Sequence, residues 1–402
     1  MIKQIEKGSF VSPKGFEFTG IHSGVKKENK DLGLIYSQVP AVAAAVYTLN
    51  KVQAEPVKLT KSSVAKESLI QAVIVNSGNA NACTGKKGME DAILMQTTVA
   101  DKLGIKPNYV AVASTGVIGE GMPMDKIIPG ISKLNTGKEA IDATNFAESI
   151  LTTDTFTKVV TFQTEIDGEI VTMSGVAKGS GMIEPNMGTM LGFIYTDANV
   201  SSSFLDNTLK SVTNQTFNCI TVDGDTSTND MVLVMANGQA NNEKITANHQ
   251  DADMFKEMLK ATSEALSKMI ARDGEGATKL IDVTVTNAVS VEDAKKIAKS
   301  IVGSSLVKTA VFGTDANWGR IIAAIGYSEA EFDPEKIDLK IGHITLLKQS
   351  EPVKFSEEEA KVLLENEIVN IYVNLNDGEY NGKAWGCDLT YDYVSINASY
   401  RS

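Results

Sequence analysis

The chain has 402 residues, of which 43% are hydrophobic and 22% are charged, a balance typical of a folded protein with a large buried core. Its 38 basic and 50 acidic residues give a net charge of −12, which argues against a nucleic-acid partner because the average field repels a polyanion. No apolar stretch reaches the roughly 18 residues of a membrane-spanning helix, and the polar N-terminus lacks the apolar region of a signal peptide. We therefore expect a cytoplasmic protein without a membrane partner.

Strand-like and helical segments alternate along the chain, which predicts a mixed α/β architecture. Two apolar runs, 69–75 and 109–113, are expected as strands. Each is followed by a polar, glycine-containing segment, Asn76–Asn79 in the first case and Ser114–Gly116 in the second, and both segments are predicted to be turns. The composition marks no clean domain boundary.

Helical periodicity marks a segment between these two strands, with Ile93 on its apolar face, and four more downstream. The five predicted helices are 86–103, 137–150, 203–217, 252–271 and 291–302. Asp167-Gly168 separates the runs 159–166 and 169–173, and this pair predicts a hairpin because both residues tolerate the positive φ of a type I′ turn. The later strands are expected at 282–288, 307–312, 337–347, 368–375 and 388–397.

The motifs that the sequence lacks argue against several kinds of active site. The three histidines occur in neither HxxxH nor HExxH, and the three cysteines form no CxxC pair, so no metal site is expected. Widely spaced, odd-numbered cysteines fit a reducing compartment. The chain contains neither a GxSxG elbow nor a phosphate-binding GxxxxGK[ST] loop. Covalent catalysis therefore needs a base other than histidine.

The run 178–197 is the most informative segment, because its small residues lead to Thr189 directly before an apolar run expected to form a buried strand. An enzyme with an N-terminal nucleophile requires a threonine at this place. After self-cleavage the threonine's own α-amine acts as its base, which removes the need for a histidine. The reference pKa of an α-amine is about 7.7–8.0, so much of it is neutral at physiological pH. The plainer alternative is a threonine that opens a core strand after a glycine-rich loop.

Six segments of this chain, taken together and in order, closely resemble the ornithine acetyltransferase family, also called glutamate N-acetyltransferase. They are Asn76–Gly85, Ser114–Gly119, Thr152–Thr155, 178–197, Val222–Asp230 and Arg272–Ala277. The likeness extends from about residue 8 to the C-terminus. It implies a self-cleaving aminopeptidase-like αββα sandwich with an additional α/β part toward the C-terminus.

The same resemblance implies a self-cleaving enzyme of arginine biosynthesis that moves an acetyl group from N-acetylornithine to glutamate and needs no cofactor. The products of cleavage would be fragments 1–188 and 189–402, intertwined in one fold and assembled as a tetramer of two α and two β fragments. The family usually has alanine before the nucleophile, whereas this chain has Gly188, which adds backbone freedom at the bond to be cleaved. Whether acetyl-CoA is also a donor is left open.

The family's functional positions carry over onto matching residues of this chain. They are Thr189 as nucleophile, Thr115 and Gly116 as oxyanion hole, and Thr152, Lys178, Glu275, Asn397 and Ser402, with Thr189, as substrate-binding residues. Each has a plainer structural alternative: a turn, a solvated lysine, a helix-ending acid or a frayed chain end. The acidic run Val222–Asp230 lacks the spacing of a calcium loop and is expected to form a hydrogen-bonded turn network near the site.

The resemblance predicts ping-pong kinetics through an acetyl ester on Thr189. Two alternatives stay open. One is an amidase or aminopeptidase of the same N-terminal-nucleophile type that hydrolyses acetylated amino acids. The other is an uncleaved, non-catalytic binding protein, for which Gly188 is the only support.

Overall fold

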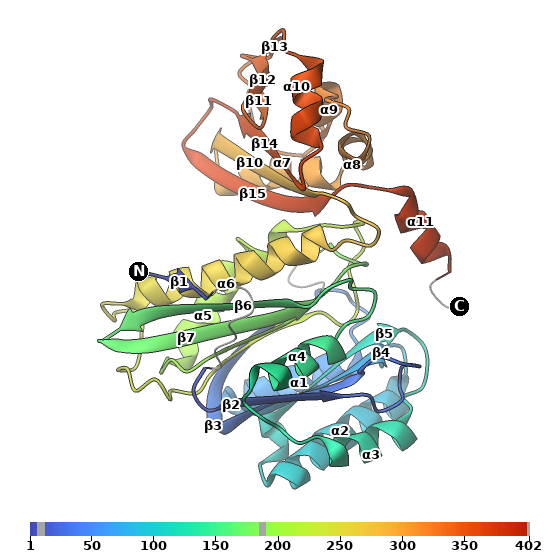
Figure 1. The fold of residues 1–402 in the computed structure, drawn as a ribbon. Helices are drawn as coiled ribbons and strands as arrows, with labels where there is room; N and C mark the ends of the chain where they lie inside the picture. Colours follow the sequence, from blue (N-terminus) through green and yellow to red (C-terminus); the bar gives the residue numbers. More distant parts are fainter. Residues whose placement is uncertain (6–12, 185–189, 400–402) are drawn as a thin grey trace. The chain divides into compact units, whose positions relative to one another are not determined.

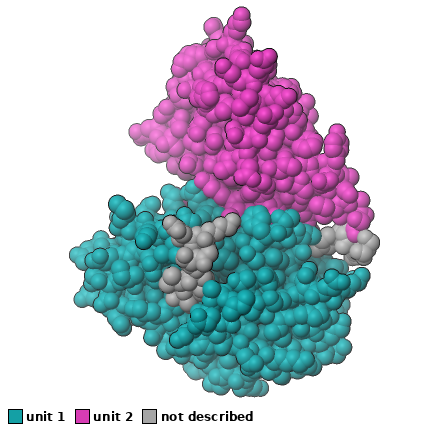
Figure 2. Space-filling view, viewed as in Figure 1, with its two compact units in different colours: residues 1–179, 186–214, 226–266 teal, residues 180–185, 215–225, 267–402 magenta. Residues whose placement is uncertain are grey.

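A computed structural model describes residues 1–5, 13–184 and 190–399, which form a mixed α/β fold, as predicted. The chain divides into two compact units, coloured separately in Figure 2. Unit 1 comprises 1–179, 186–214 and 226–266, and unit 2 comprises 180–185, 215–225 and 267–402. Each unit therefore contains residues from both sides of the predicted cleavage point. The division into fragments 1–188 and 189–402 stays a prediction.

Unit 1 contains the long mixed sheet and the helices around it. Its strands are β1 (Lys3–Gln4), β2 (Phe16–Ile21), β3 (Leu32–Tyr47), β4 (Leu69–Asn79), β5 (Val110–Val117), β6 (Lys158–Ile166), β7 (Glu169–Lys178), β8 (Leu191–Thr196) and β9 (Met231–Ala236). Its helices are α1 (Glu55–Glu67), α2 (Gly85–Leu103), α3 (Met124–Lys133), α4 (Ala140–Ser149), α5 (Ser202–Thr213) and most of α6 (Ala252–Arg272), with a 3₁₀ turn η1 (Pro107–Tyr109).

The strands of unit 1 follow the order β1-β6-β7-β8-β9-β3-β4-β5, with β2 paired to β3. Strand β3 is 16 residues long and its register shifts between Tyr36 and Ala41. Its first half pairs with β2 and β4, whereas its second half pairs with β9. This one strand therefore joins two halves of the sheet.

The inner faces of the two halves share one apolar core, in which Val73 and Phe18 belong to one half and Phe193 and Leu233 to the other. Helices α2 and α3 cover the outer face of β4 and β5 (Figure 1). Helix α6 covers the outer face of β7, where a Cβ at Gly175 would lie 2.7 Å from Leu266 Cδ1. This αββα layering agrees with the sandwich that the resemblance implied.

Unit 2 is built on a six-stranded sheet in the order β13-β12-β11-β14-β10-β15. Its strands are β10 (Leu280–Ala288), β11 (Asp338–Ile341), β12 (Ile344–Lys348), β13 (Glu351–Pro352), β14 (Ile368–Asn374) and β15 (Tyr380–Cys387). Its helices are α7 (Val291–Gly303), α8 (Ser305–Phe312), α9 (Trp318–Gly326), α10 (Glu357–Leu364) and α11 (Tyr391–Ala398), with a 3₁₀ turn η2 (Phe217–Cys219). The core of unit 2 packs α7–α10 against one face of this sheet (Figure 1).

Several predicted elements are wrong in type or extent. Residues 307–312 lie in helix α8, which begins where the Ser304 side chain accepts a hydrogen bond from the Val307 N–H. Likewise, the last strand is β15, and the predicted strand 388–397 is mainly helix α11, capped by Thr390. The segment 337–347 forms two strands, because Gly342 turns at φ 55°. Ile93 of α2 is 43% exposed, so it lies outside the buried face predicted for it.

None of the helices in the described part of the chain is long and apolar enough to cross a membrane.

Candidate active site

The predicted oxyanion residue Thr115 and the predicted substrate lysine Lys178 meet in unit 1. Lys178 is the last residue of β7 and Thr115 lies near the end of β5, and the Lys178 Nζ donates to Thr115 Oγ1 over 3.3 Å. Both side chains are buried, and Lys178 is opposite Leu191 in the register of β7 and β8. The predicted nucleophile Thr189 and its neighbour Gly188 lie outside the described residues.

Gly116 adopts a backbone conformation that suits glycine. Its φ is 132°, and a Cβ at this position would overlap the backbone of Gly78 on β4. The turns predicted at Asn76–Asn79 and Ser114–Gly116 are wrong, because β4 and β5 continue in parallel as far as Asn79 and Val117. Gly116 is opposite Gly78 in the pairing of β4 and β5, just before the register shifts at Asn79. A glycine is required at residue 116 because the two strands approach each other closely there.

Changing Gly116 to alanine is expected to lower the melting temperature by several degrees, because it adds a Cβ where there is strain and no space. Gly119→Ala is the matched control: its φ of 85° is also positive, but nothing lies within 4 Å of the added Cβ. Thermal unfolding of both variants separates backbone strain from overlap. Equal shifts in the two variants would contradict the overlap at Gly78.

The buried carboxylate of Asp154 organises the residues around Lys178. Its oxygens accept hydrogen bonds from Lys158 Nζ (2.7 Å), the Gly179 N–H (2.7 Å) and the Thr152 N–H (3.0 Å). Burial alone would raise the pKa of Asp154, but Lys178, Lys158 and the Gly179 N–H together lower it to about 2. Asp154 thus links the backbone of Thr152 to that of Gly179, the residue after Lys178. The only sequence signal for Asp154 was its place within the Thr152–Thr155 motif.

Asn229, which lies just before β9, holds the end of β5 in place through its side-chain amide. Its Nδ2 donates to the carbonyl oxygens of Ala80 (2.6 Å) and Ser114 (2.8 Å), so it holds the residue before Thr115 in place. Asn229 belongs to the acidic run Val222–Asp230, which was predicted to form a turn network near the site. Asn229 thus takes part in a hydrogen-bond network next to Thr115, and the place of the run near an active site stays a prediction.

The two described predicted residues of unit 2, Glu275 and Asn397, contact each other. Asn397 Nδ2 on α11 donates to Glu275 Oε2 over 2.7 Å, and Glu275 is 8% exposed. The Glu275 N–H donates to the Ser180 carbonyl, and Gly181 has no room for a side chain beside the Glu275 carboxylate. The two glycines that flank Glu275 are also closely packed, because an added Cβ would lie 2.5 Å from Cys387 Sγ at Gly274 and 2.7 Å from the Tyr393 backbone nitrogen at Gly276. Ser402 lies outside the described residues.

A second carboxylate of unit 2, Asp223, holds the segment before the predicted cleavage point. It accepts hydrogen bonds from the backbone N–H groups of Met182 (2.7 Å) and Ile183 (2.8 Å) and from the Tyr393 hydroxyl (3.3 Å). Burial and the nearby Asp223 raise the pKa of Tyr393, so its hydroxyl keeps its proton at neutral pH. Tyr393 was not among the predicted site residues, and nothing in its local sequence marks it.

Comparison with known proteins decides the family. The ArgJ family profile matches residues 17–402. Arginine biosynthesis bifunctional protein ArgJ of Geobacillus kaustophilus (strain HTA426) is 58% identical over 401 residues, covering 100% of this chain and 98% of that protein. This chain belongs to the ArgJ family. It is accordingly an acyltransferase of arginine biosynthesis, which confirms the enzyme class that its motifs indicated.

Two solved structures are also similar to this ArgJ family chain. Arginine biosynthesis bifunctional protein ArgJ from Bacillus halodurans is 60% identical with a TM-score of 0.51, and the match covers 51% of this chain and 97% of that one. Ornithine acetyltransferase complexed with ornithine, from Mycobacterium tuberculosis, is 34% identical with a TM-score of 0.43, covering 46% of this chain and 99% of that one.

One group of side chains in this ArgJ family member has the composition of a metal site, namely Asp167, His249 and Asp251. Both ring nitrogens of His249 are already engaged, because Nδ1 accepts from the Asp251 N–H and Nε2 lies 3.1 Å from Asp167 Oδ2. Asp167 also accepts from the Glu243 N–H. The group therefore fastens the β6–β7 hairpin turn to the start of α6, and a metal would have to displace these bonds.

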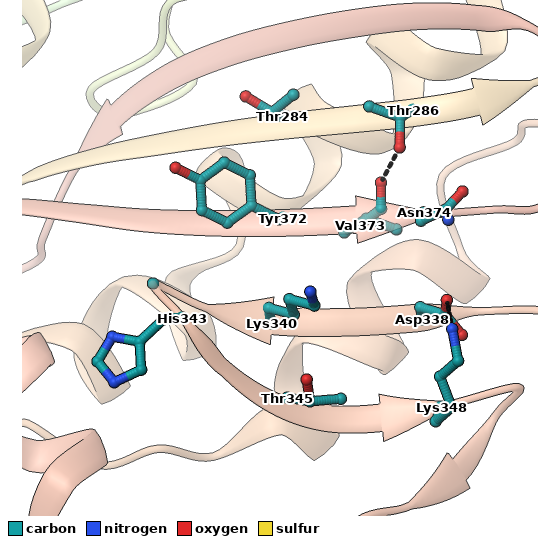
Figure 3. Close-up of a pocket in the computed structure, with 11 residues that line it drawn as sticks. Thr284, Thr286, Asp338, Lys340, His343, Thr345, Lys348, Tyr372, Val373 and Asn374 are labelled. Atoms are coloured by element: carbon teal, nitrogen blue, oxygen red, sulfur yellow. Dashed lines mark hydrogen bonds and ion pairs between the residues drawn. The ribbon is translucent and has the colours of Figure 1, made fainter.

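A cavity of about 690 Å³ lies on unit 2 and contains none of the predicted site residues (Figure 3). Side chains from four neighbouring strands line it, and Tyr372 of β14 lies between its pairing partners Thr284 of β10 and Lys340 of β11. Lys348 forms an ion pair with Asp338 over 2.6 Å at one edge.

Proposed function

We propose that this protein transfers an acetyl group from N-acetylornithine to glutamate through an acetyl ester on Thr189. Membership of the ArgJ family supports the reaction class. The observation that supports the proposed site is the contact between Lys178 and Thr115. Because Lys178 is opposite Leu191, the first residue of β8, this contact lies at the start of that strand. Met190 is buried, and Thr189 directly precedes it in the sequence.

The proposal requires cleavage between Gly188 and Thr189, which frees the α-amine that acts as base. The similar Bacillus halodurans chain supports it, because 97% of that chain matches only 51% of this one, so the solved polypeptide is about half as long. The proposed fragment 189–402 is likewise about half of this chain. We further propose that two α and two β fragments assemble into a tetramer in the cytoplasm.

In the first half-reaction the neutral α-amine of Thr189 takes the hydroxyl proton, and Oγ attacks the acetyl carbonyl of N-acetylornithine. The negative charge on the carbonyl oxygen is stabilised by the Thr115 hydroxyl and the Gly116 N–H. The C–N bond then breaks, and the departing ornithine nitrogen takes the proton from the α-ammonium of Thr189. In the second half-reaction the neutral amine of glutamate attacks the ester carbonyl and the C–Oγ bond breaks. The proton that the glutamate nitrogen loses passes through the α-amine to Oγ, which restores the Thr189 hydroxyl.

The charge around Asp154 suits substrates that carry an α-carboxylate. The field of this one buried carboxylate is shared by three lysines, Lys26, Lys158 and Lys178. Lys26 also faces the carboxylate of Asp31, so three lysines stand against two carboxylates and the balance is positive by one charge. Burial is the main cause that lowers the pKa of Lys26, while Asp31 and Asp154 oppose it and Lys178 adds to it. Lys178 is the proposed partner of the substrate carboxylate, which it binds as a charge-assisted hydrogen bond.

The decisive experiment incubates purified protein with glutamate and one acetyl donor at a time, either N-acetylornithine or acetyl-CoA. We expect N-acetylglutamate from N-acetylornithine, with parallel double-reciprocal plots. The named relatives are bifunctional, so the acetyl-CoA reaction tests a second activity. Free acetate without N-acetylglutamate would instead support the amidase alternative. A single full-length band on a denaturing gel with no turnover would support an uncleaved binding protein.

A further inference from the structure

The loop between β2 and β3 holds the backbone of Lys26 in a fixed place. The buried Asp31 carboxylate accepts hydrogen bonds from the backbone N–H groups of Ser23 (2.6 Å), Gly24 (3.0 Å) and Lys26 (3.0 Å). The Asp31 carbonyl accepts another from the Ser77 N–H of β4, over 2.9 Å. One aspartate therefore orders the loop and joins it to the sheet.

The Lys26 side chain extends from this loop along the candidate active site of unit 1. A Cβ added to Gly78 would lie 3.0 Å from Lys26 Cγ, so the stem of the lysine lies against that glycine. Gly78 is the pairing partner of Gly116, the proposed oxyanion residue. At its end, the Lys26 ammonium donates to the Leu151 carbonyl over 3.0 Å, directly before Thr152 in the sequence. The lysine therefore connects two parts of the candidate site.

No carboxylate contacts this ammonium within the part of the chain that the structure describes. Its Nζ makes one hydrogen bond, to a neutral carbonyl oxygen, although an ammonium has three N–H donors. Asp31 binds the loop backbone, and Asp154 pairs with Lys158 over 2.7 Å. Both aspartates act on the ammonium through their charge rather than by contact. A partly buried ammonium is stabilised by a contacting anion, so Lys26 is suited to bind one.

The two proposed substrates differ in the charge of their side chains. Both carry an α-carboxylate, for which Lys178 is the proposed partner, but glutamate adds a γ-carboxylate where N-acetylornithine has an ammonium. The charge of Lys178 acts on Lys26, which places the two lysines in the same region. They are held by different acceptors, Thr115 Oγ1 for Lys178 and the Leu151 carbonyl for Lys26. Two separately held cations suit two carboxylates, and Lys26 would repel a second ammonium.

We propose that Lys26 is a specificity-determining residue that binds the γ-carboxylate of glutamate in the second half-reaction. This contact forms only after ornithine has left, so it selects the acceptor without a role in cleavage or in the first half-reaction. The inference rests on the proposed function and adds a residue for recognition of the acceptor.

Two variants of Lys26 and a neutral acceptor test this role. Lys26→Met removes the charge but keeps most of the stem, and Lys26→Arg keeps a cation. Lys27→Met is the matched control, because Lys27 is the next residue and is exposed. Each full-length protein is assayed with N-acetylornithine as donor and either glutamate or glutamine as acceptor, since glutamine has the shape of glutamate without the γ charge. In a ping-pong reaction, kcat/KM for each substrate reports its own half-reaction.

We expect Lys26→Met to lower kcat/KM for glutamate about 10–100-fold, the range for loss of one charged hydrogen bond. The value for N-acetylornithine stays within about threefold, because its half-reaction does not use this contact. Wild type prefers glutamate over glutamine, and the preference falls below about threefold in Lys26→Met. With glutamate, Lys26→Arg stays within about fivefold of wild type and Lys27→Met within about twofold.

An unchanged preference for glutamate over glutamine in Lys26→Met would overturn the role of Lys26, because a purely structural loss affects both acceptors equally. Equal losses with glutamate and N-acetylornithine would also overturn it, since they would place Lys26 on the shared α-carboxylate. If Lys26→Met does not fold, Lys26→Gln replaces it under the same criteria. The proposed function fails separately, when the wild-type protein itself is uncleaved or transfers no acetyl group.

Discussion

Replacing Thr189 with alanine is expected to leave one full-length polypeptide that transfers no measurable acetyl group. Alanine removes the hydroxyl that attacks the preceding peptide bond, so the α-amine base is never released. The same change removes the nucleophile of acetyl transfer. Loss of a nucleophile together with its base typically lowers kcat by about 10⁶-fold. A denaturing gel and a glutamate acetylation assay measure the two losses on the same preparation.

Thr189→Ser is the control, because it keeps the hydroxyl and removes only a methyl group. We expect the serine variant to be cleaved and active, at a reduced rate. Mass spectrometry of wild-type enzyme stopped during turnover should place an acetyl group on the residue that begins the 189–402 fragment. The assignment is wrong if the alanine variant still transfers acetyl groups, or if active wild-type protein has an unbroken chain across residues 188 and 189.

The sequence predicted best those parts of the fold that local residues determine. The Asp167-Gly168 hairpin is an example: both residues have positive φ, 53° and 79°, and Ile166 pairs with Glu169 as a two-residue turn requires. The long helix α6 ends at Arg272, within a residue of its predicted end. In both cases the turn residues or the period carry the information without help from distant contacts.

Short apolar segments are where the sequence failed, because their type depends on caps and on packing. The run in α8 contains Val307 and Val311 and reads equally well as a buried strand. Its helical state depends on the Ser304 cap and on burial in the core of unit 2. Similarly, Gly116 was predicted to lie in a turn, because nothing local indicates that Gly78 of a neighbouring strand approaches it.

The candidate active site also contains residues that the sequence predicted and residues that it did not. Motif resemblance named Thr115 and Lys178, which the fold does bring together. It did not single out Asp154 or Lys26, because their importance comes from burial and from neighbours far away in the sequence. In the sequence, an aspartate in a polar motif looks the same whether it is solvated, paired with lysines, or buried in an environment that raises its pKa. Only the three-dimensional surroundings separate Asp154, whose pKa is about 2, from Asp230, whose pKa is raised.

Asp154→Asn is expected to lower the free energy of unfolding at pH 7 by about 3–5 kcal/mol, the usual loss when one partner of a buried ion pair is removed. Both Asp154 and Lys158 are fully buried, so the lysine would be left without its carboxylate in the interior. The Gly179 and Thr152 N–H groups would share a weaker, uncharged acceptor. Acetyl transfer should also fall, because Lys178 loses the charge that holds it beside Thr115.

The pH dependence gives this variant a signature of its own. Since the folded pKa of Asp154 is about 2 and the unfolded value is about 3.9, its stabilisation is complete above pH 4 and is lost as the pH falls toward 2. The difference in the free energy of unfolding between wild type and Asp154→Asn, measured by urea unfolding, should therefore be constant near neutral pH and become smaller between pH 4 and 2.

Asp206→Asn is the matched control, because Asp206 pairs with Lys210 at the same i,i+4 spacing but on the surface. That change should alter stability by less than about 0.5 kcal/mol. Equal losses in the two variants would show that burial of the Asp154–Lys158 pair contributes nothing, and that the charges around Lys178 are as weakly coupled as those at the surface.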